Sequence, residues 1–209
     1  TNYPANIVIL HQIERGPFAP SYVPFAVKLE TYLRMANLPY MNVHSYEMSP
    51  KGKMPWIEYN GEIVSDSQFC IEFLNKKFDK DLNKHLSLEN KAIGRAFQKM
   101  TMMLFRLNFD DDMKMMSLEN MSRFLKWWSH RYYCRWNLRN AKAHGIGRHS
   151  KQEVHSIMMA DLKALSDFLA LIEKCFIFSE FTNLCQYCER MKETFWPDWN
   201  ECITNGGAS

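Results

Sequence analysis

The chain has 209 residues, of which 46% are apolar, and it carries a net charge of +3 at pH 7. This length allows one large hydrophobic core or two smaller ones, and no apolar run approaches the roughly 20 residues of a transmembrane helix or resembles a secretory signal. The six cysteines do not follow the spacing of a disulfide framework, so we expect a reduced, cytoplasmic protein.

The first 80 residues alternate between segments typical of strands and of helices. Pro24 is a good first residue for a helix, and apolar residues recur at helical spacing from Ala26 to Ala36. The expected elements are a strand at 7–10, a helix at 24–36, a strand at 40–43, two strands at 56–59 and 62–64, and a helix at 68–77. With the first two strands parallel through a right-handed crossover, this order predicts a thioredoxin-like α/β domain over residues 1–80.

A tight hairpin is predicted between the last two of these strands. Asn60-Gly61 supplies the two residues with positive φ that a type I′ turn requires. Pro55 opens the first hairpin strand, where its missing N–H breaks no ladder bond. The trans preference of an X–Pro bond is only about 0.5–1 kcal/mol. A cis bond here would turn the Met54 backbone outward, where its N–H and C=O could pair with a peptide-like ligand.

Asp66 and Ser67 follow the hairpin at the expected start of a helix. They place side-chain acceptors and backbone N–H donors at a helix N-terminus, which is a suitable position for an anion. We therefore expect Met54, Pro55, Asp66 and Ser67 to form a ligand-binding site. The alternative is that the proline and the cap serve folding alone, because both stabilise the joint between hairpin and helix.

Helical periodicity dominates the rest of the chain, so we predict an all-helical second domain over residues 81–209. Ser150 and Glu153 have the spacing of a capping box, which predicts the start of a helix. The inward face of that helix is formed by Val154, Met158, Leu162, Leu165, Leu169 and Ile172. The other expected helical segments are a region from Ser87, a zone over 119–139 interrupted by Gly145-Ile146-Gly147, and a helix over 184–195 stopped by Pro197.

Several motifs together resemble the failed axon connections family. They are Pro24-Phe25, Lys28–Ala36, Lys51–Asn60, His144–Arg148, Tyr187–Arg190 and Phe195–Pro197. That family is related to the metaxins and to the cadmium-responsive proteins of worms. The resemblance implies a glutathione-transferase fold without demonstrated catalysis, a role in axon development and, for the metaxins, in mitochondrial import. It also implies that Met54, Pro55, Asp66 and Ser67 would contact glutathione, the candidate cofactor.

One departure from the transferase pattern concerns the residue that activates the thiol of glutathione. Serine-type transferases and their close relatives carry Ser, or Cys in another class, immediately before a Pro-Phe pair. Here that position is Val23, whose side chain cannot donate a hydrogen bond to a thiolate. Ser21 and Tyr22 are the fallback residues for such a role if the loop is turned differently. We therefore expect no catalytic residue at position 23.

A second departure concerns the length of the helical domain. Relatives continue after Leu169 with a loop and a capped central helix, whereas this chain passes almost directly to Asn183. The stretch from Met100 to Asp112 also looks shortened. A splice form, a gene-model error and a true divergence would each produce this pattern. We therefore expect a shortened helical domain.

The charges are unevenly distributed, because residues 120–152 contain eight Lys and Arg residues and no Asp or Glu. The aromatic residues interleaved with them are Trp127, Trp128, Tyr132, Tyr133 and Trp136. This composition suits an anionic membrane surface or an acidic protein, and no recognised nucleic-acid-binding module is present. The alternative is a helix whose aromatic side chains enter a core while the charged groups reach solvent.

The sequence thus predicts a non-catalytic binding or interaction module that takes glutathione or a peptide-like ligand. One alternative is a glutathione transferase that conjugates small electrophiles. The other is a peripheral membrane adaptor acting through residues 120–152, and a homodimer is left open. No metal site is expected, because Cys185 and Cys188 lack further ligands and the adjacent carboxylates Asp110–Asp112 lack the spacing of a calcium loop.

Overall fold

A computed structural model describes residues 3–107, 145–173 and 182–204, together with Arg135, Arg139, Lys142 and Ala143. The chain divides into two compact units. The first unit joins Thr1–His85 with Cys188–Ser209, and the second is Leu86–Tyr187. The predicted domains, 1–80 and 81–209, follow the order of the chain instead, and that division stays a prediction.

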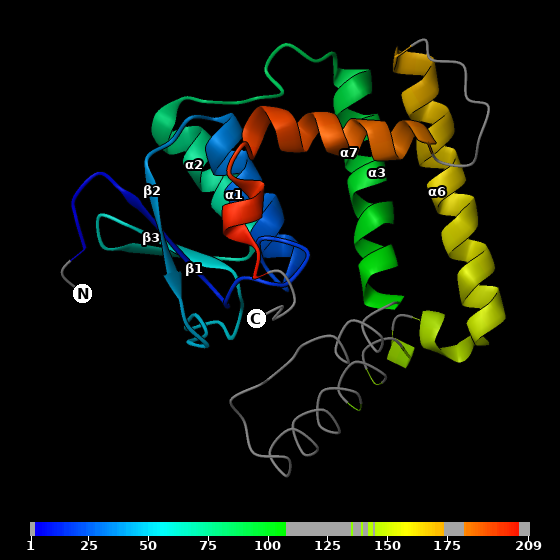
Figure 1. Cartoon of the computed structure of the whole chain (residues 1–209), viewed down its shortest axis with the longest axis horizontal. Coiled ribbons are helices and arrows are strands. Elements are labelled where there is room, and N and C mark those ends of the chain that lie inside the picture. The colour runs from blue at the N-terminus through cyan, green and yellow to red at the C-terminus, as the bar shows by residue number, and fades with distance from the viewer. Residues whose placement is uncertain are drawn as a thin grey trace. The chain divides into compact units, whose positions relative to one another are not determined.

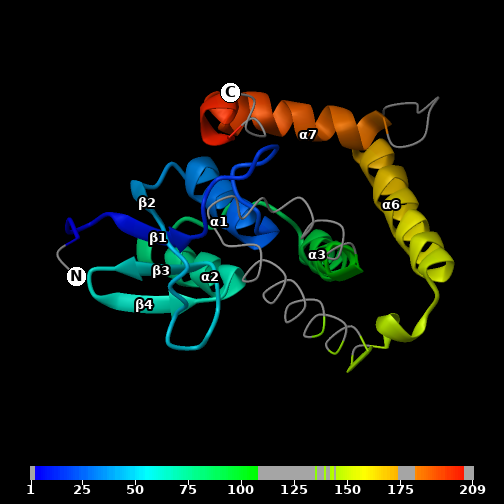
Figure 2. The ribbon, with the colours of Figure 1, turned by 60° about the horizontal axis from the view of Figure 1, so that its bottom comes forward.

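The first unit contains a four-stranded sheet (Figures 1 and 2). Its strand order is β2 (Tyr40–His44), β1 (Val8–Gln12), β3 (Trp56–Tyr59) and β4 (Glu62–Ser65). Strands β1 and β2 are parallel, whereas β3 runs antiparallel to both β1 and β4. The four predicted strands are therefore present, and their ends differ from the predictions by at most two residues.

Two helices, α1 (Pro24–Met35) and α2 (Ser67–Phe78), cover one face of this sheet (Figure 2). The apolar stripe predicted on α1 is buried, with Leu29 and Leu33 fully inaccessible. The core that they share with the sheet consists of Val8, Leu10, Leu29, Tyr32, Leu33, Ala36, Leu38, Ile57, Tyr59, Cys70 and Leu74. Burying a side chain such as Leu29 contributes about 1.5–3 kcal/mol to the stability of the fold. This core therefore holds α1 and α2 against the sheet.

The hairpin between β3 and β4 has the predicted turn. Asn60 has φ of 49° and Gly61 has φ of 82°, as a type I′ turn requires. The Asn60 side chain also accepts a hydrogen bond of 2.8 Å from the Asn6 backbone N–H. The turn therefore sets the register of β3 against β4 and so fixes where α2 begins.

The second unit is helical in the part that the structure describes. Its elements are α3 (Leu88–Leu107), η1 (Ile146–Arg148), α6 (Lys151–Glu173) and the beginning of α7 (Thr182–Phe195). The predicted capping box is present, because Ser150 N–H donates to Glu153 at 2.7 Å and Glu153 N–H donates back to Ser150 at 3.3 Å. Of the predicted helical zone 119–139, only Arg135 and Arg139 lie within the described residues, and both are helical.

Aromatic and polar contacts join the helices of the second unit. The rings of Phe97 on α3 and Phe168 on α6 lie 4.6 Å apart. The buried Asn183 side chain donates to the Ser166 carbonyl at 2.6 Å, and the Ser166 hydroxyl donates to the Asn183 amide oxygen at 2.7 Å. Among the described helices, none has both the length and the apolar character needed to cross a membrane.

Candidate ligand-binding site

The first part of the predicted site lies at the entrance to β3. The Met54–Pro55 peptide bond is cis, Pro55 is fully buried and Met54 is half-buried. Neither the N–H nor the C=O of Met54 is hydrogen-bonded to another residue in the described part of the chain. These two backbone groups are therefore the donor and acceptor that an extended ligand could pair with.

The second part lies at the beginning of α2. Asp66 is the N-cap residue, with φ of 77°, and its carboxylate accepts a hydrogen bond of 3.0 Å from the Gln68 N–H. Ser67 is the first residue of the helix and is 4% exposed. The first N–H groups of a helix lack intrahelical acceptors and carry a partial positive charge. This end of α2 therefore has the backbone donors that an anionic group requires, and its use as a binding site stays a prediction.

A cationic side chain that the sequence analysis missed lies beside this helix end. The Lys28 ammonium group on α1 donates to the Gln68 amide oxygen at 2.9 Å. The Gln68 amide nitrogen in turn donates to Glu72 at 3.0 Å. Lys28 thus adds positive charge close to the N-terminus of α2. Its sequence position gives no signal of this role, because the contact spans 40 residues and requires α1 and α2 to be packed together.

Val23 occupies the N-cap position of α1, and its side chain makes no capping hydrogen bond. Its carbonyl oxygen accepts from the Ala26 N–H at 2.8 Å, while its N–H donates to the Ser21 hydroxyl oxygen at 3.3 Å. Ser21 is only 4% exposed and Tyr22 is half-buried. The Ser21 hydroxyl is thus turned onto the backbone at the start of α1.

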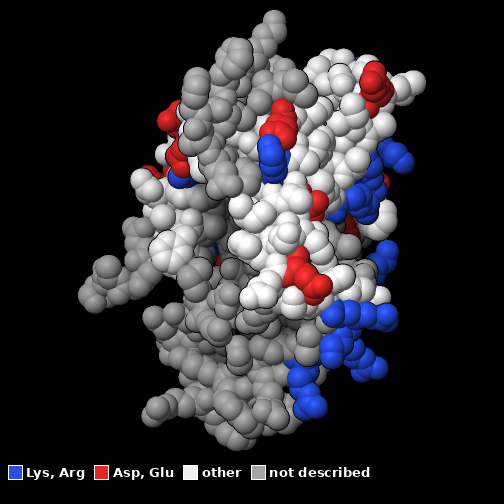
Figure 3. Space-filling view, turned by 90° about the vertical axis from the view of Figure 1, so that its right-hand side faces the viewer, with Lys and Arg blue, Asp and Glu red and all other residues white. Residues whose placement is uncertain are grey.

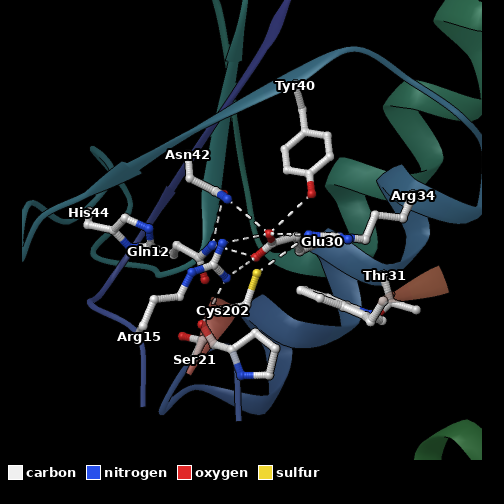
Figure 4. A network of polar contacts seen from close by, with 12 residues as sticks. Gln12, Arg15, Ser21, Glu30, Thr31, Arg34, Tyr40, Asn42, His44 and Cys202 are labelled. Carbon is white, nitrogen blue, oxygen red and sulfur yellow. Dashed lines mark hydrogen bonds and ion pairs between the residues drawn. The ribbon is translucent and has the colours of Figure 1, made fainter. Parts of the chain in front are cut away.

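A cluster of polar side chains centred on the buried Glu30 lies between α1 and strands β1 and β2 (Figure 4). We call it the Glu30 cluster, and its members are Gln12, Arg15, Glu30, Arg34, Tyr40 and Asn42. The Glu30 side chain has no exposed surface. Arg15 binds its two oxygens at 2.8 and 3.0 Å, Gln12 donates at 2.8 Å, and Asn42 donates at 2.9 Å. Tyr40 donates at 3.2 Å and the Arg34 guanidinium lies 3.8 Å away.

This environment keeps Glu30 ionised. Burial alone would raise the pKa of Glu30, but hydrogen bonds from Arg15, Gln12 and Asn42 outweigh it and hold the pKa below its ordinary value. Burial and the Glu30 charge together raise the pKa of the Tyr40 hydroxyl. Because these contacts come from within the chain, the cluster acts as an internal brace between α1, β1 and β2.

The Glu30 cluster was not predicted from the sequence, although one signal was present. Glu30 falls within the apolar stripe of α1, at the spacing shared by Ala26, Leu29 and Leu33. An acidic residue on a buried helix face requires a partner. That partner could not be identified from the helix alone, because Gln12 and Asn42 come from two different strands.

The residue after Pro55 is held by a second set of contacts. The Trp56 ring is stacked on His11, with centroids 3.5 Å apart, and its Nε1 donates to the Glu47 carbonyl at 3.0 Å. Both ring nitrogens of His11 are buried without a hydrogen-bond partner among the described residues. Burial lowers the pKa of His11, although Glu58 and Glu47 act in the opposite direction. Trp56 therefore fixes the loop that leads into the Met54–Pro55 bond.

The cysteines and the acidic run noted in the sequence add no further chemistry to this site. Cys70 is fully buried, and burial raises the pKa of its thiol to about 12, so it is unsuited to act as a nucleophile. Cys185 and Cys188 are exposed and form no disulfide with a described residue. No group of three or more potential metal ligands occurs among the described residues, and Asp110–Asp112 lie outside them.

The basic segment 120–152 is described only in part. Arg135, Arg139, Lys142 and Arg148 all have exposed side chains. On the face shown in Figure 3, Lys and Arg side chains gather along one edge. The aromatic residues that were predicted to accompany them lie outside the described residues.

Comparison with known proteins finds glutathione-transferase-like relatives of this chain. The glutathione S-transferase N-terminal domain family matches residues 24–107. Failed axon connections of Drosophila melanogaster is 28% identical over 270 aligned residues, which cover 98% of this chain and 62% of that protein. The alignment is longer than this chain of 209 residues, so the Drosophila protein has segments that this chain lacks.

Solved structures of transferases have a similar fold. A glutathione S-transferase of Ceriporiopsis subvermispora, determined in complex with glutathione, has a TM-score of 0.54 and 14% identity, covering 96% of this chain and 93% of that one. A glutathione transferase from Phanerochaete chrysosporium has a TM-score of 0.52 and 15% identity, covering 80% and 74%. At these identities the likeness shows the fold alone. The comparisons confirm the predicted fold class and the predicted resemblance.

Proposed function

We propose that this chain, a glutathione-transferase-like member of the failed axon connections family, works as a non-catalytic binding module for glutathione or a similar peptide-like ligand. The chain spans 62% of the length of its Drosophila relative, and the proposal concerns this part alone. A cytoplasmic location belongs to the same proposal.

The observation that carries the proposal is the chemistry of two side chains at the start of α1, those of Val23 and Ser21. Val23 stands at the N-cap with an isopropyl side chain, which cannot donate to a thiolate. Ser21, two residues earlier, is 4% exposed, and its hydroxyl oxygen accepts the Val23 N–H. A thiol bound beside α1 would therefore keep an ordinary pKa and remain largely protonated at neutral pH.

The binding half of the proposal rests on the other end of the site. The Met54 backbone offers a donor and an acceptor to an extended ligand, and Asp66 with the N-terminus of α2 can hold its charged groups. Lys28 supplies a positive charge at the same helix end. The Ceriporiopsis transferase of similar fold was determined with glutathione bound, which makes glutathione the first ligand to test.

Calorimetric titration with glutathione tests binding. We expect the unmodified chain to bind, and Asp66→Ala to bind at least about tenfold more weakly, since it loses both the cap and a charged ligand contact. Asp167→Ala, which removes an exposed carboxylate on α6, is the matched control and should bind normally. Absence of binding by the unmodified chain would exclude both the binding module and the transferase.

A conjugation assay with glutathione and chlorodinitrobenzene tests the non-catalytic part. We expect no turnover above the uncatalysed rate for the unmodified chain, and measurable turnover for Val23→Ser, which restores a hydroxyl donor. Turnover by the unmodified chain would instead establish the transferase alternative. Ser21→Ala and Tyr22→Phe would then identify which hydroxyl activates the thiol.

A second candidate function is peripheral binding to an anionic membrane. It is favoured by the exposure of Arg135, Arg139, Lys142 and Arg148, within a stretch that contains no acidic residue. Each exposed basic side chain near an anionic surface contributes about 1 kcal/mol. Sedimentation with vesicles rich in phosphatidylserine should retain the chain at low salt and release it as salt rises. Equal retention on neutral vesicles, or none on either kind, would exclude this function.

A further inference from the structure

A segment far along the chain packs onto α1 in the first unit. We call Phe195–Thr204, which includes η2 (Trp199–Cys202), the docking segment. The Arg34 guanidinium lies 3.8 Å from the centroid of the Trp196 ring and donates to the Asp198 carboxylate at 2.9 Å. It also donates to the Phe195 carbonyl at 3.3 Å. The Arg34 side chain of α1 therefore contacts three residues of the docking segment, Phe195, Trp196 and Asp198.

Further contacts extend this attachment in both directions. Trp196 is 3% exposed, and its Nε1 donates to the Thr31 hydroxyl at 3.0 Å. The Cys202 thiol, which is buried, donates to Asp198 at 3.3 Å. At the far end of the segment, the Thr204 N–H donates to the Gly16 carbonyl at 2.9 Å. The docking segment thus reaches from the second half of α1 to the loop that precedes α1.

That loop, residues 13–23, is held from the other side by the Glu30 cluster. Arg15 lies in the loop and binds Glu30 with both terminal nitrogens, and one of these nitrogens also donates to the Pro20 carbonyl at 3.0 Å (Figure 4). Gly16 N–H donates to the Ala19 carbonyl at 3.0 Å, and a Cβ on Gly16 would meet that oxygen at 3.0 Å. The loop is therefore a tight turn whose position depends on Arg15 and on Thr204.

We infer that the docking segment positions the loop at residues 13–23, and through it the start of α1 beside the proposed ligand site. Asp198 and Arg34 are the positioning residues. The loop ends at Ser21 and Val23, so its position decides where the Ser21 hydroxyl and the first N–H groups of α1 lie. The part of this inference that concerns the ligand rests on the proposed function. The part that concerns the loop does not.

Hydrogen–deuterium exchange of the full chain tests the loop. Asp198→Ala removes the carboxylate that binds Arg34 and Cys202, and we expect backbone amides at 13–23 and 195–204 to exchange roughly tenfold faster, as a locally released segment does. Amides of β1 and β3 should keep their protection. The control Glu201→Ala changes an exposed carboxylate in the same short helix and should leave the loop unchanged.

Two further variants separate positioning from general damage. Asp198→Glu keeps the charge and should restore most of the protection of the loop. Trp196→Phe keeps a ring under Arg34 but loses the hydrogen bond to Thr31, so it should loosen the docking segment less than Asp198→Ala does. Unchanged exchange at 13–23 in Asp198→Ala, or an equal rise over β1 and β3, would overturn the inference.

Titration of Asp198→Ala with glutathione tests whether the docking segment also affects ligand binding. If the unmodified chain binds glutathione, we expect the variant to bind several-fold more weakly, because the start of α1 is no longer fixed. Normal affinity together with a loosened loop would overturn the link between the docking segment and the site. If the unmodified chain does not bind glutathione, the proposed function fails, while the exchange measurement still decides whether the segment positions the loop.

Discussion

The Glu30 cluster and the candidate ligand site both contain polar groups, but those groups differ in whether the chain supplies their partners. Around Glu30 the chain supplies the partners itself, from two strands, a loop and α1. At the ligand site the Met54 backbone groups find no partner within the described residues, and Val23 offers no polar group from its side chain. Substitutions in the cluster should therefore act mainly on stability, and substitutions at the site mainly on binding.

The largest effect is expected from Glu30→Ala. Removing this carboxylate leaves Arg15 without its buried counter-charge and takes away the oxygen that accepts one hydrogen bond each from Gln12 and Asn42. Breaking a buried ion pair by deleting one partner typically costs about 3–5 kcal/mol, which chemical denaturation would measure. Glu62→Ala, in an exposed ion pair with Lys77, is the control and should change little. An equal loss in the free energy of unfolding for the two variants would show that the Glu30 cluster stabilises the fold no more than an exposed ion pair does.

Acid should weaken the fold through the same residue. The pKa of Glu30 is lower in the folded chain than its ordinary value of 4.5, so the unfolded chain takes up the proton first as the pH falls. The contribution of Glu30 is therefore complete above about pH 4.5 and is lost below it, by at most about 1.4 kcal/mol per pH unit. Chemical denaturation at a series of pH values between 7 and 3 measures this loss. The free energy of unfolding should fall less steeply with pH in Glu30→Gln than in the unmodified chain. A slope identical to that of the unmodified chain would contradict this origin.

A smaller loss of stability is expected at the start of α2. Asp66→Ala removes the cap on the Gln68 N–H, which should lower the free energy of unfolding by about 1 kcal/mol. Asp66→Asn keeps a capping oxygen and tolerates positive φ, so its stability should stay close to that of the unmodified chain while its affinity for glutathione falls. If both variants bind glutathione normally, Asp66 serves the fold alone.

The smallest change in stability is expected from Lys28→Met. The apolar part of the side chain is retained, and the lost hydrogen bond to Gln68 lies at a half-buried position, so the free energy of unfolding should change by no more than about 1 kcal/mol. Affinity for glutathione should nevertheless fall several-fold, because a cation beside the α2 N-terminus is removed. If Lys28→Met lowers the free energy of unfolding but leaves the affinity for glutathione unchanged, Lys28 serves the fold and not the binding of the ligand.

The features predicted correctly from the sequence depend on short stretches of chain. Asn60-Gly61 identified the hairpin turn, the spacing of Ser150 and Glu153 identified a helix start, and the stripe along α1 identified its buried face. In each case the residues that decide the structure lie within one or two turns of one another. Such patterns report local backbone geometry, which neighbouring residues largely determine.

The features that were missed depend on residues far apart in the sequence. Lys28 meets Gln68 across 40 positions, and Arg34 meets Asp198 across 164. Neither pair has a spacing that a helix or a hairpin would explain, so the contact appears only once the fold is known. The position that carries Ser or Cys in transferases, by contrast, was located at Val23 from the Pro24-Phe25 pair that follows it. The structure added the orientation of Ser21.

The bond between Arg34 and Asp198 has a consequence for the newly made protein. Ribosomes add about 5–20 residues per second, so Asp198 emerges roughly 8–33 seconds after Arg34, the pair being 164 positions apart. During that interval the nascent sheet and α1 exist without the residues that cover Thr31 and Arg34. Thr31 and Arg34 are then exposed, and early termination before residue 195 would leave them without these partners permanently.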